Sequence, residues 1–88
     1  MVKNYMEIVV DNILKKILPD YSNLCKCEKC CDDIKAIALN NLKPIYVVTN
    51  AGNLYAKVNE LEIQFSTDIV KELVKAIDIV SKNPHHNS

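Results

Sequence analysis

The sequence contains no arginine and no tryptophan, and its only glycine is Gly52. All 11 basic residues are lysines, and 11 acidic residues balance them, so the formal net charge is zero. Without arginine the chain lacks the planar side chain that binds guanine or phosphate through two parallel hydrogen bonds. Without a basic excess it also lacks the electrostatic signature of a nucleic-acid binder, so we expect no direct binding to DNA.

Long apolar runs are also missing. No stretch approaches the roughly 18 consecutive apolar residues of a membrane-spanning helix. The first 18 residues carry Glu7, Asp11, Lys15 and Lys16 inside their apolar pattern, which is not typical of a signal peptide. We therefore expect a cytoplasmic protein with no membrane partner. In a reducing compartment, clustered thiols favour metal binding or redox chemistry over structural disulfides.

The length and composition predict one small globular domain over residues 1–88, with 83–88 as a flexible polar tail. The chain has 88 residues, of which 49% are hydrophobic. A chain of this size has a thin core, and such chains often depend on a metal, a disulfide or a second subunit. The predicted helices carry more apolar surface than a small sheet can cover, so we expect a homodimer.

The N-terminal segment predicts an amphipathic helix. Asn4 can cap it, and Glu7 stands three residues later at the capping-box position. Apolar residues then recur at helical spacing from Val9 to Leu18, and Pro19 ends the pattern. A second helix is expected after the cysteines, ending shortly before the next proline.

A β-hairpin is predicted after this second helix. Residues 45–49 and 54–58 are rich in β-branched and aromatic side chains, and an Asn-Ala-Gly-Asn turn separates them. In such a hairpin Tyr46 and Tyr55 would face each other across the two strands. Residues 59–65 fit either a strand or a helix.

A last helix is predicted from a cap at Ser66 or Thr67 to a stop at Pro84. The expected fold class is therefore α+β: a small, mostly helical domain of about three helices with a short β-hairpin.

Four cysteines fall within seven residues, in the pattern C-x-C-x-x-C-C, and none occurs elsewhere. Zinc prefers four tetrahedral ligands, usually thiolates or imidazoles. Cys27 and Cys30 form a CxxC pair, and Cys25 adds a third thiolate from an extended segment. Cys31 is the predicted fourth ligand. The sequence therefore predicts a structural zinc site.

The fourth ligand has alternatives, because neighbouring residues on a helix point about 100° apart. Cys31 also fits a small apolar side chain on the same face as Ile34. His85 or His86 could complete the site instead. The CxxC pair is also compatible with a thiol redox protein, although no βαβ pattern surrounds it.

The segments "NYMEIVVDNIL", "CKCEKCCDDIKAIALNNLKPIYVVT" and "GNLYAK" resemble the late competence development protein ComFB family of bacteria. The resemblance implies a small cytoplasmic dimer with zinc in the cysteine cluster, no known enzymatic activity, and a role in competence or regulation through protein contacts. It also implies an alternative function as a receptor for a cyclic dinucleotide, c-di-GMP or c-di-AMP.

The resemblance places the ligand surface on the second helix and the proline turn after it. Lys43 stands where the family commonly has proline, and Ile45 where it commonly has arginine. The implied ligand-binding residues are Asp33, Lys35, Asn40, Lys43, Pro44 and Tyr46.

Overall fold

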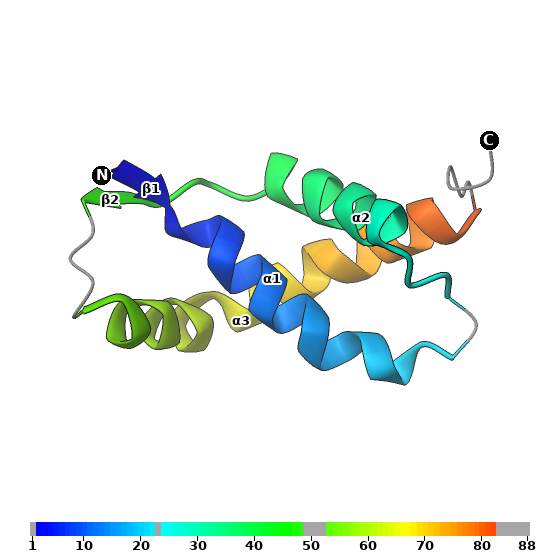
Figure 1. Ribbon diagram of the computed structural model, residues 1–88, viewed down its shortest axis with the longest axis horizontal. Helices are drawn as coiled ribbons and strands as arrows, with labels where there is room; N and C mark the ends of the chain where they lie inside the picture. The colour runs from blue at the N-terminus through cyan, green and yellow to red at the C-terminus, as the bar shows by residue number, and fades with distance from the viewer. Residues whose placement is uncertain (1, 23, 49–52, 83–88) are drawn as a thin grey trace.

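The computed structural model describes residues 2–22, 24–48 and 53–82 (Figure 1). Within them, three α-helices form most of the structure, and two short strands lie at one end. The elements in chain order are β1 (Val2–Asn4), α1 (Tyr5–Ile17), the 3₁₀ helix η1 (Leu18–Asp20), α2 (Glu28–Asn40), β2 (Tyr46–Val48) and α3 (Leu54–Lys82).

Helix α1 begins as predicted at the Asn4 cap. The Asn4 side-chain oxygen accepts a hydrogen bond from the Met6 N–H at 3.1 Å and another from the Ile45 N–H at 3.0 Å. The Tyr5 N–H donates to the Ile45 carbonyl at 2.9 Å. Asn4 therefore satisfies a free donor at the helix start and also ties α1 to the segment before β2.

The predicted hairpin is wrong. The strand over 46–48 exists, but its partner is β1: Val2 pairs with Val48, Lys3 with Val47 and Asn4 with Tyr46, in antiparallel register. Residues 54–58 belong to α3, so Tyr55 does not face Tyr46 across a hairpin. The expected turn over 50–53 lies largely outside the described residues.

The last helix begins much earlier than predicted, because α3 is one helix of 29 residues. Ser66 and Thr67 lie inside this helix, so neither is its N-terminal cap. Its early half has its own helical period, in which Val58 and Leu61 are buried and Phe65 packs against the core. The spacings of three and four residues match one face of a helix and outweigh the β-branched and aromatic content of the segment.

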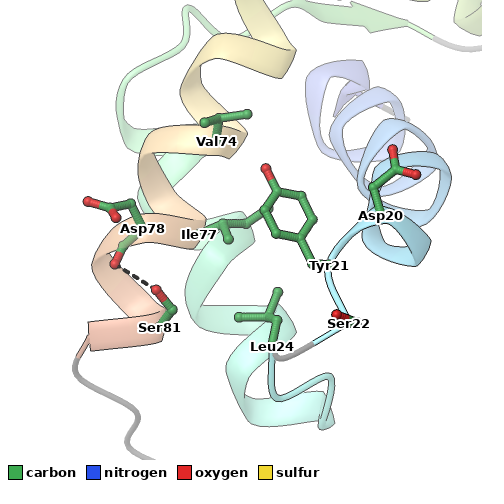
Figure 2. A pocket seen from close by; sticks show the side chains of 8 residues that line it. All are labelled: Asp20, Tyr21, Ser22, Leu24, Val74, Ile77, Asp78 and Ser81. Atoms are coloured by element: carbon green, nitrogen blue, oxygen red, sulfur yellow. Dashed lines mark hydrogen bonds between the residues drawn. The ribbon is translucent and has the colours of Figure 1, made fainter.

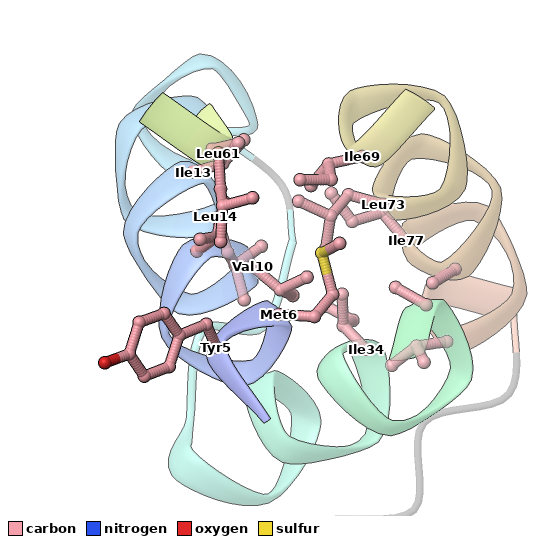
Figure 3. Packing of buried hydrophobic residues seen from close by; sticks show 14 of the residues in the cluster. Tyr5, Met6, Val10, Ile13, Leu14, Ile34, Leu61, Ile69, Leu73 and Ile77 are labelled. Atoms are coloured by element: carbon pink, nitrogen blue, oxygen red, sulfur yellow. The ribbon is translucent and has the colours of Figure 1, made fainter. Parts of the chain in front are cut away.

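The hydrophobic core lies where α3 packs against α1 and α2, which also contact each other. Figure 3 shows side chains from the three helices meeting in one cluster, with Met6 of α1 directed at Leu73 of α3. Ile34 joins them from α2. No polar or charged side chain is buried among the described residues. None of the described helices is long and apolar enough to cross a membrane.

Candidate metal centre and ligand surface

Three of the four cysteines lie together at the start of α2. The sulfur atoms of Cys25, Cys27 and Cys30 are all within 4.8 Å of one another. Cys30 is only 1% exposed and lies on the same face of α2 as the buried Ile34 and Ala38, at spacings of four residues. Cys25 and Cys27 are half-buried and come from the segment that leads into the helix. The cluster therefore joins this segment to the hydrophobic core.

Cys27 is the N-terminal cap of α2. Its sulfur accepts a hydrogen bond from the Cys30 N–H at 3.4 Å, and its carbonyl accepts the first helical bond from the Cys31 N–H at 3.0 Å. The Cys30 N–H is the main cause that lowers the pKa of the Cys27 thiol, and the Cys25 thiol adds to it. The start of α2 therefore favours a negative charge on this sulfur.

Cys30 behaves in the opposite way. Burial, together with the nearby Cys27 and Cys25 thiols, raises its pKa to about 12. Three adjacent thiols cannot all lose their protons near neutral pH unless a cation lies between them. Thiolates are soft ligands that select zinc and related metals. The donor set therefore fits a thiophilic metal ion, with Cys25, Cys27 and Cys30 as ligands.

Cys31 lies outside this group of sulfurs. Its thiol donates to the Lys26 carbonyl, with the sulfur 3.6 Å from the oxygen, and burial raises its pKa. It is half-buried against the core, whereas Cys30 is the cysteine that shares the fully buried face with Ile34. The other predicted candidates for a fourth ligand, His85 and His86, lie outside the described residues. The fourth ligand therefore stays a prediction.

Two of the predicted ligand residues lie along the middle of α2. Lys35 forms ion pairs with Asp11 of α1 at 3.1 Å and with Asp32 at 3.5 Å. Hydrogen bonds from Lys15 and Lys35 lower the pKa of Asp11, and the bond to Asp11 raises the pKa of Lys35. Asp11, Asp32 and Lys35 line a groove between α1 and α2. Asp33 is half-buried, and its Oδ2 atom has no hydrogen-bond partner among the described residues.

The other four predicted ligand residues lie at or beyond the end of α2. Asn40 is its exposed last residue, and Tyr46 is 64% exposed on β2. Lys43 and Pro44 line a cavity of about 460 Å³ between this connection and α3. The full lining is Met6, Asn41, Leu42, Lys43, Pro44, Ile45, Phe65, Asp68, Lys71 and Glu72.

The α3 residues of this cavity were not predicted. Phe65, Asp68 and Lys71 follow Lys43 by more than twenty positions, and their pattern shows only an ordinary amphipathic helix. The structure brings Lys43 and Pro44 together with them, whereas Lys35 lines the separate groove beside α1.

Comparisons with known proteins support the resemblance. The family model described as late competence development protein ComFB matches residues 3–84. The chain belongs to the ComFB family. It is 29% identical over 84 residues to the competence protein ComFB of Bacillus subtilis (strain 168), covering 96% of this chain and 86% of that protein. It also matches a solved structure of the late competence protein ComFB from Bacillus subtilis, with a TM-score of 0.81 and 28% identity, over 99% of this chain and 96% of the other.

The ComFB match spans both regions described above, because residues 3–84 contain the four cysteines and the whole of α2 with its following connection. The fold and the family are therefore established together.

Proposed function

We propose that this chain is a non-catalytic ComFB-family protein whose fold is held by zinc and which acts through protein contacts, as a homodimer, in competence or a related regulatory process. The observation that carries the metal part is the approach of three cysteine sulfurs to within 4.8 Å. The name of the Bacillus subtilis relative, competence protein ComFB, supports the competence part.

Zinc would be held by Cys25, Cys27 and Cys30. When bound, it supplies the positive charge that keeps the three sulfurs deprotonated. Cys30 anchors the site to the buried face of α2, and Cys27 caps the helix through the Cys30 N–H. Cys25 brings the end of the preceding connection to the same point. The three residues therefore hold the connection after η1 against the core, which suits a structural role.

The protein-contact part is supported by exposed apolar side chains on α3. Tyr55 is 84% exposed and Ile63 is 82% exposed, on the half of α3 before Ser66. Exposed large apolar groups that gather on one element are typical of interaction surfaces. We assign this half of α3 to contact between two copies of the chain.

Native mass spectrometry of freshly purified protein tests both parts. We expect a dimer with one zinc ion per subunit. The double variant Tyr55→Lys with Ile63→Lys should keep its zinc and become a monomer, while Ile79→Lys on the same helix serves as a control. A folded protein without metal would overturn the zinc proposal, and a monomeric wild type would overturn the dimer.

A second candidate function is binding of a cyclic dinucleotide, favoured by the cavity of about 460 Å³ beside Lys43. Its volume lies in the range of small-molecule sites. Lys43 and Lys71 offer two cations for phosphate, and Phe65 and Pro44 offer apolar surface for a base. Calorimetric titration with c-di-GMP and c-di-AMP should give saturable binding that Lys43→Ala weakens and the control Lys57→Ala does not. Equal affinity in both variants would remove this candidate.

A further inference from the structure

A second cavity lies at the other end of the molecule, between the segment after η1 and the last turns of α3 (Figure 2). Its volume is about 440 Å³. Neither the metal centre nor the cavity beside Lys43 shares a residue with it. It is lined by Asp20, Tyr21, Ser22, Leu24, Val74, Ile77, Asp78 and Ser81.

The wall of this cavity is apolar and partly uncovered. Tyr21 and Leu24 pack against the hydrophobic core from one side, and the buried Ile77 comes from α3. Val74 is 43% exposed, so an apolar side chain of α3 faces solvent beside them. Figure 2 shows the Tyr21 ring between Ile77 and Asp20. The wall can therefore take the methylene groups of a long side chain, and the Tyr21 ring offers a π-face.

The charged groups that line the cavity are both acidic, Asp20 and Asp78. Figure 2 shows their carboxyl groups on opposite sides of the Tyr21 ring in this view. Lys82 pairs with Asp78 at 3.2 Å, but the two side chains are 71% and 63% exposed. An exposed pair of this kind is weak, so an incoming cation can replace the lysine. The charge of the lining favours a cationic occupant.

We propose that this cavity binds an arginine side chain of a protein partner. The stem lies along Val74 and Ile77, the guanidinium stacks on Tyr21, and its N–H groups donate to Asp20 and Asp78. A planar guanidinium suits the ring and the carboxylates better than an ammonium group. The inference rests on the proposed protein-contact function and gives it a partner chemistry. Because this chain has no arginine, a second copy cannot supply the side chain.

NMR titration of the ¹⁵N-labelled full-length protein tests the proposal. The titrant is the blocked peptide Gly-Gly-Arg-Gly-Gly, and its control carries citrulline, which has the same shape without the charge. We expect saturable shifts at Tyr21, Leu24 and Val74 with the arginine peptide. Tyr21→Leu and the double variant Asp20→Asn with Asp78→Asn should each weaken binding by about threefold to tenfold. The double variant Glu60→Gln with Asp68→Asn, an equal charge change elsewhere on α3, should leave the affinity unchanged.

Three results would overturn the proposal: equal binding of the citrulline peptide, an equal loss in the double variant Glu60→Gln with Asp68→Asn, or shifts that do not map to this cavity. Zinc content and mass are measured on the same sample. A zinc-loaded dimer that ignores the arginine peptide refutes this inference alone. A metal-free monomer refutes the proposed function, whatever the peptide does.

Discussion

The two ends of α2 are built differently. At the first, three sulfurs lie within 4.8 Å of one another and Cys30 enters the core. At the other, the connection through Lys43 and Pro44 borders a cavity lined by both apolar and charged side chains. That second end is held where the Ile45 N–H donates to the Asn4 side-chain oxygen and the Ile45 carbonyl accepts from the Tyr5 N–H. The cysteine end of α2 is therefore suited to stabilising the fold, and the Lys43 end is suited to binding a ligand.

The largest effect should come from Cys30→Ala. It removes a fully buried ligand, so the zinc should be lost and the free energy of unfolding should fall by about 3 kcal/mol or more. Metal content by elemental analysis and urea unfolding measure both changes.

The matched variant is Cys31→Ala on the next residue. Its sulfur lies outside the three-cysteine group, so this variant should keep its metal and lose much less stability. If both variants lose zinc equally, Cys31 is the fourth ligand. If Cys30→Ala has the same free energy of unfolding as the wild type, a metal at the first end of α2 does not stabilise the fold.

A medium effect is expected for Asn4→Ala, which acts on the second end. It removes the cap of α1 and the acceptor of the Ile45 N–H, so the free energy of unfolding should fall by about 1–2 kcal/mol. Urea unfolding measures it, with Asn59→Ala in the exposed part of α3 as the control. A loss no greater than that of Asn59→Ala would show that the connection before β2 does not depend on Asn4.

The sequence predicts the cysteine end of α2 better than the Lys43 end, because the residues of the first lie close together in the chain and those of the second do not. Cys25, Cys27 and Cys30 span six positions, and a turn entering a helix brings such residues together, so the pattern alone predicts the cluster. The cavity beside Lys43 needs Phe65 and Lys71 from α3, and nothing local specifies how α3 crosses that connection.

The hairpin error has the same origin. Residues 54–58 have the composition of a strand, but their period continues into the buried face of α3. The true partner of β2 is a segment of three residues at the N-terminus, too short to give an alternating pattern. The cap at Asn4 was predictable because its signal is local, whereas its bond to Ile45 was not.

A smaller effect is expected from the ion pair that joins α1 to the middle of α2. Lys15 and Lys35 lower the pKa of Asp11 in the folded protein. The charged Asp11 therefore stabilises the fold fully at any pH above 3.8, the ordinary pKa of this side chain. That contribution is lost as the pH falls through the lowered value. Asp11→Asn should cost about 1 kcal/mol or less at pH 7, because the pair is partly exposed.

The test compares wild type and Asp11→Asn by urea unfolding over a range of pH. The difference in the free energy of unfolding should shrink toward zero as the pH falls through the lowered pKa of Asp11. Taking the difference cancels the loss of metal in acid, which affects both proteins. A difference that persists in acid would assign the effect of Asp11 to packing and not to charge.

The smallest effect on stability should come from Lys43→Ala. Lys43 is exposed on the connection and lines the cavity, so its removal should change the free energy of unfolding by about 0.5 kcal/mol or less and leave the zinc content unchanged. Ten residues of α2 follow Cys30, so about 15 Å of helix separates this buried cysteine from the connection that carries Lys43. Substitutions that far apart act independently, so Lys43→Ala combined with Cys31→Ala should show the sum of the single effects in urea unfolding. Loss of zinc in Lys43→Ala would show that the two ends of α2 are coupled.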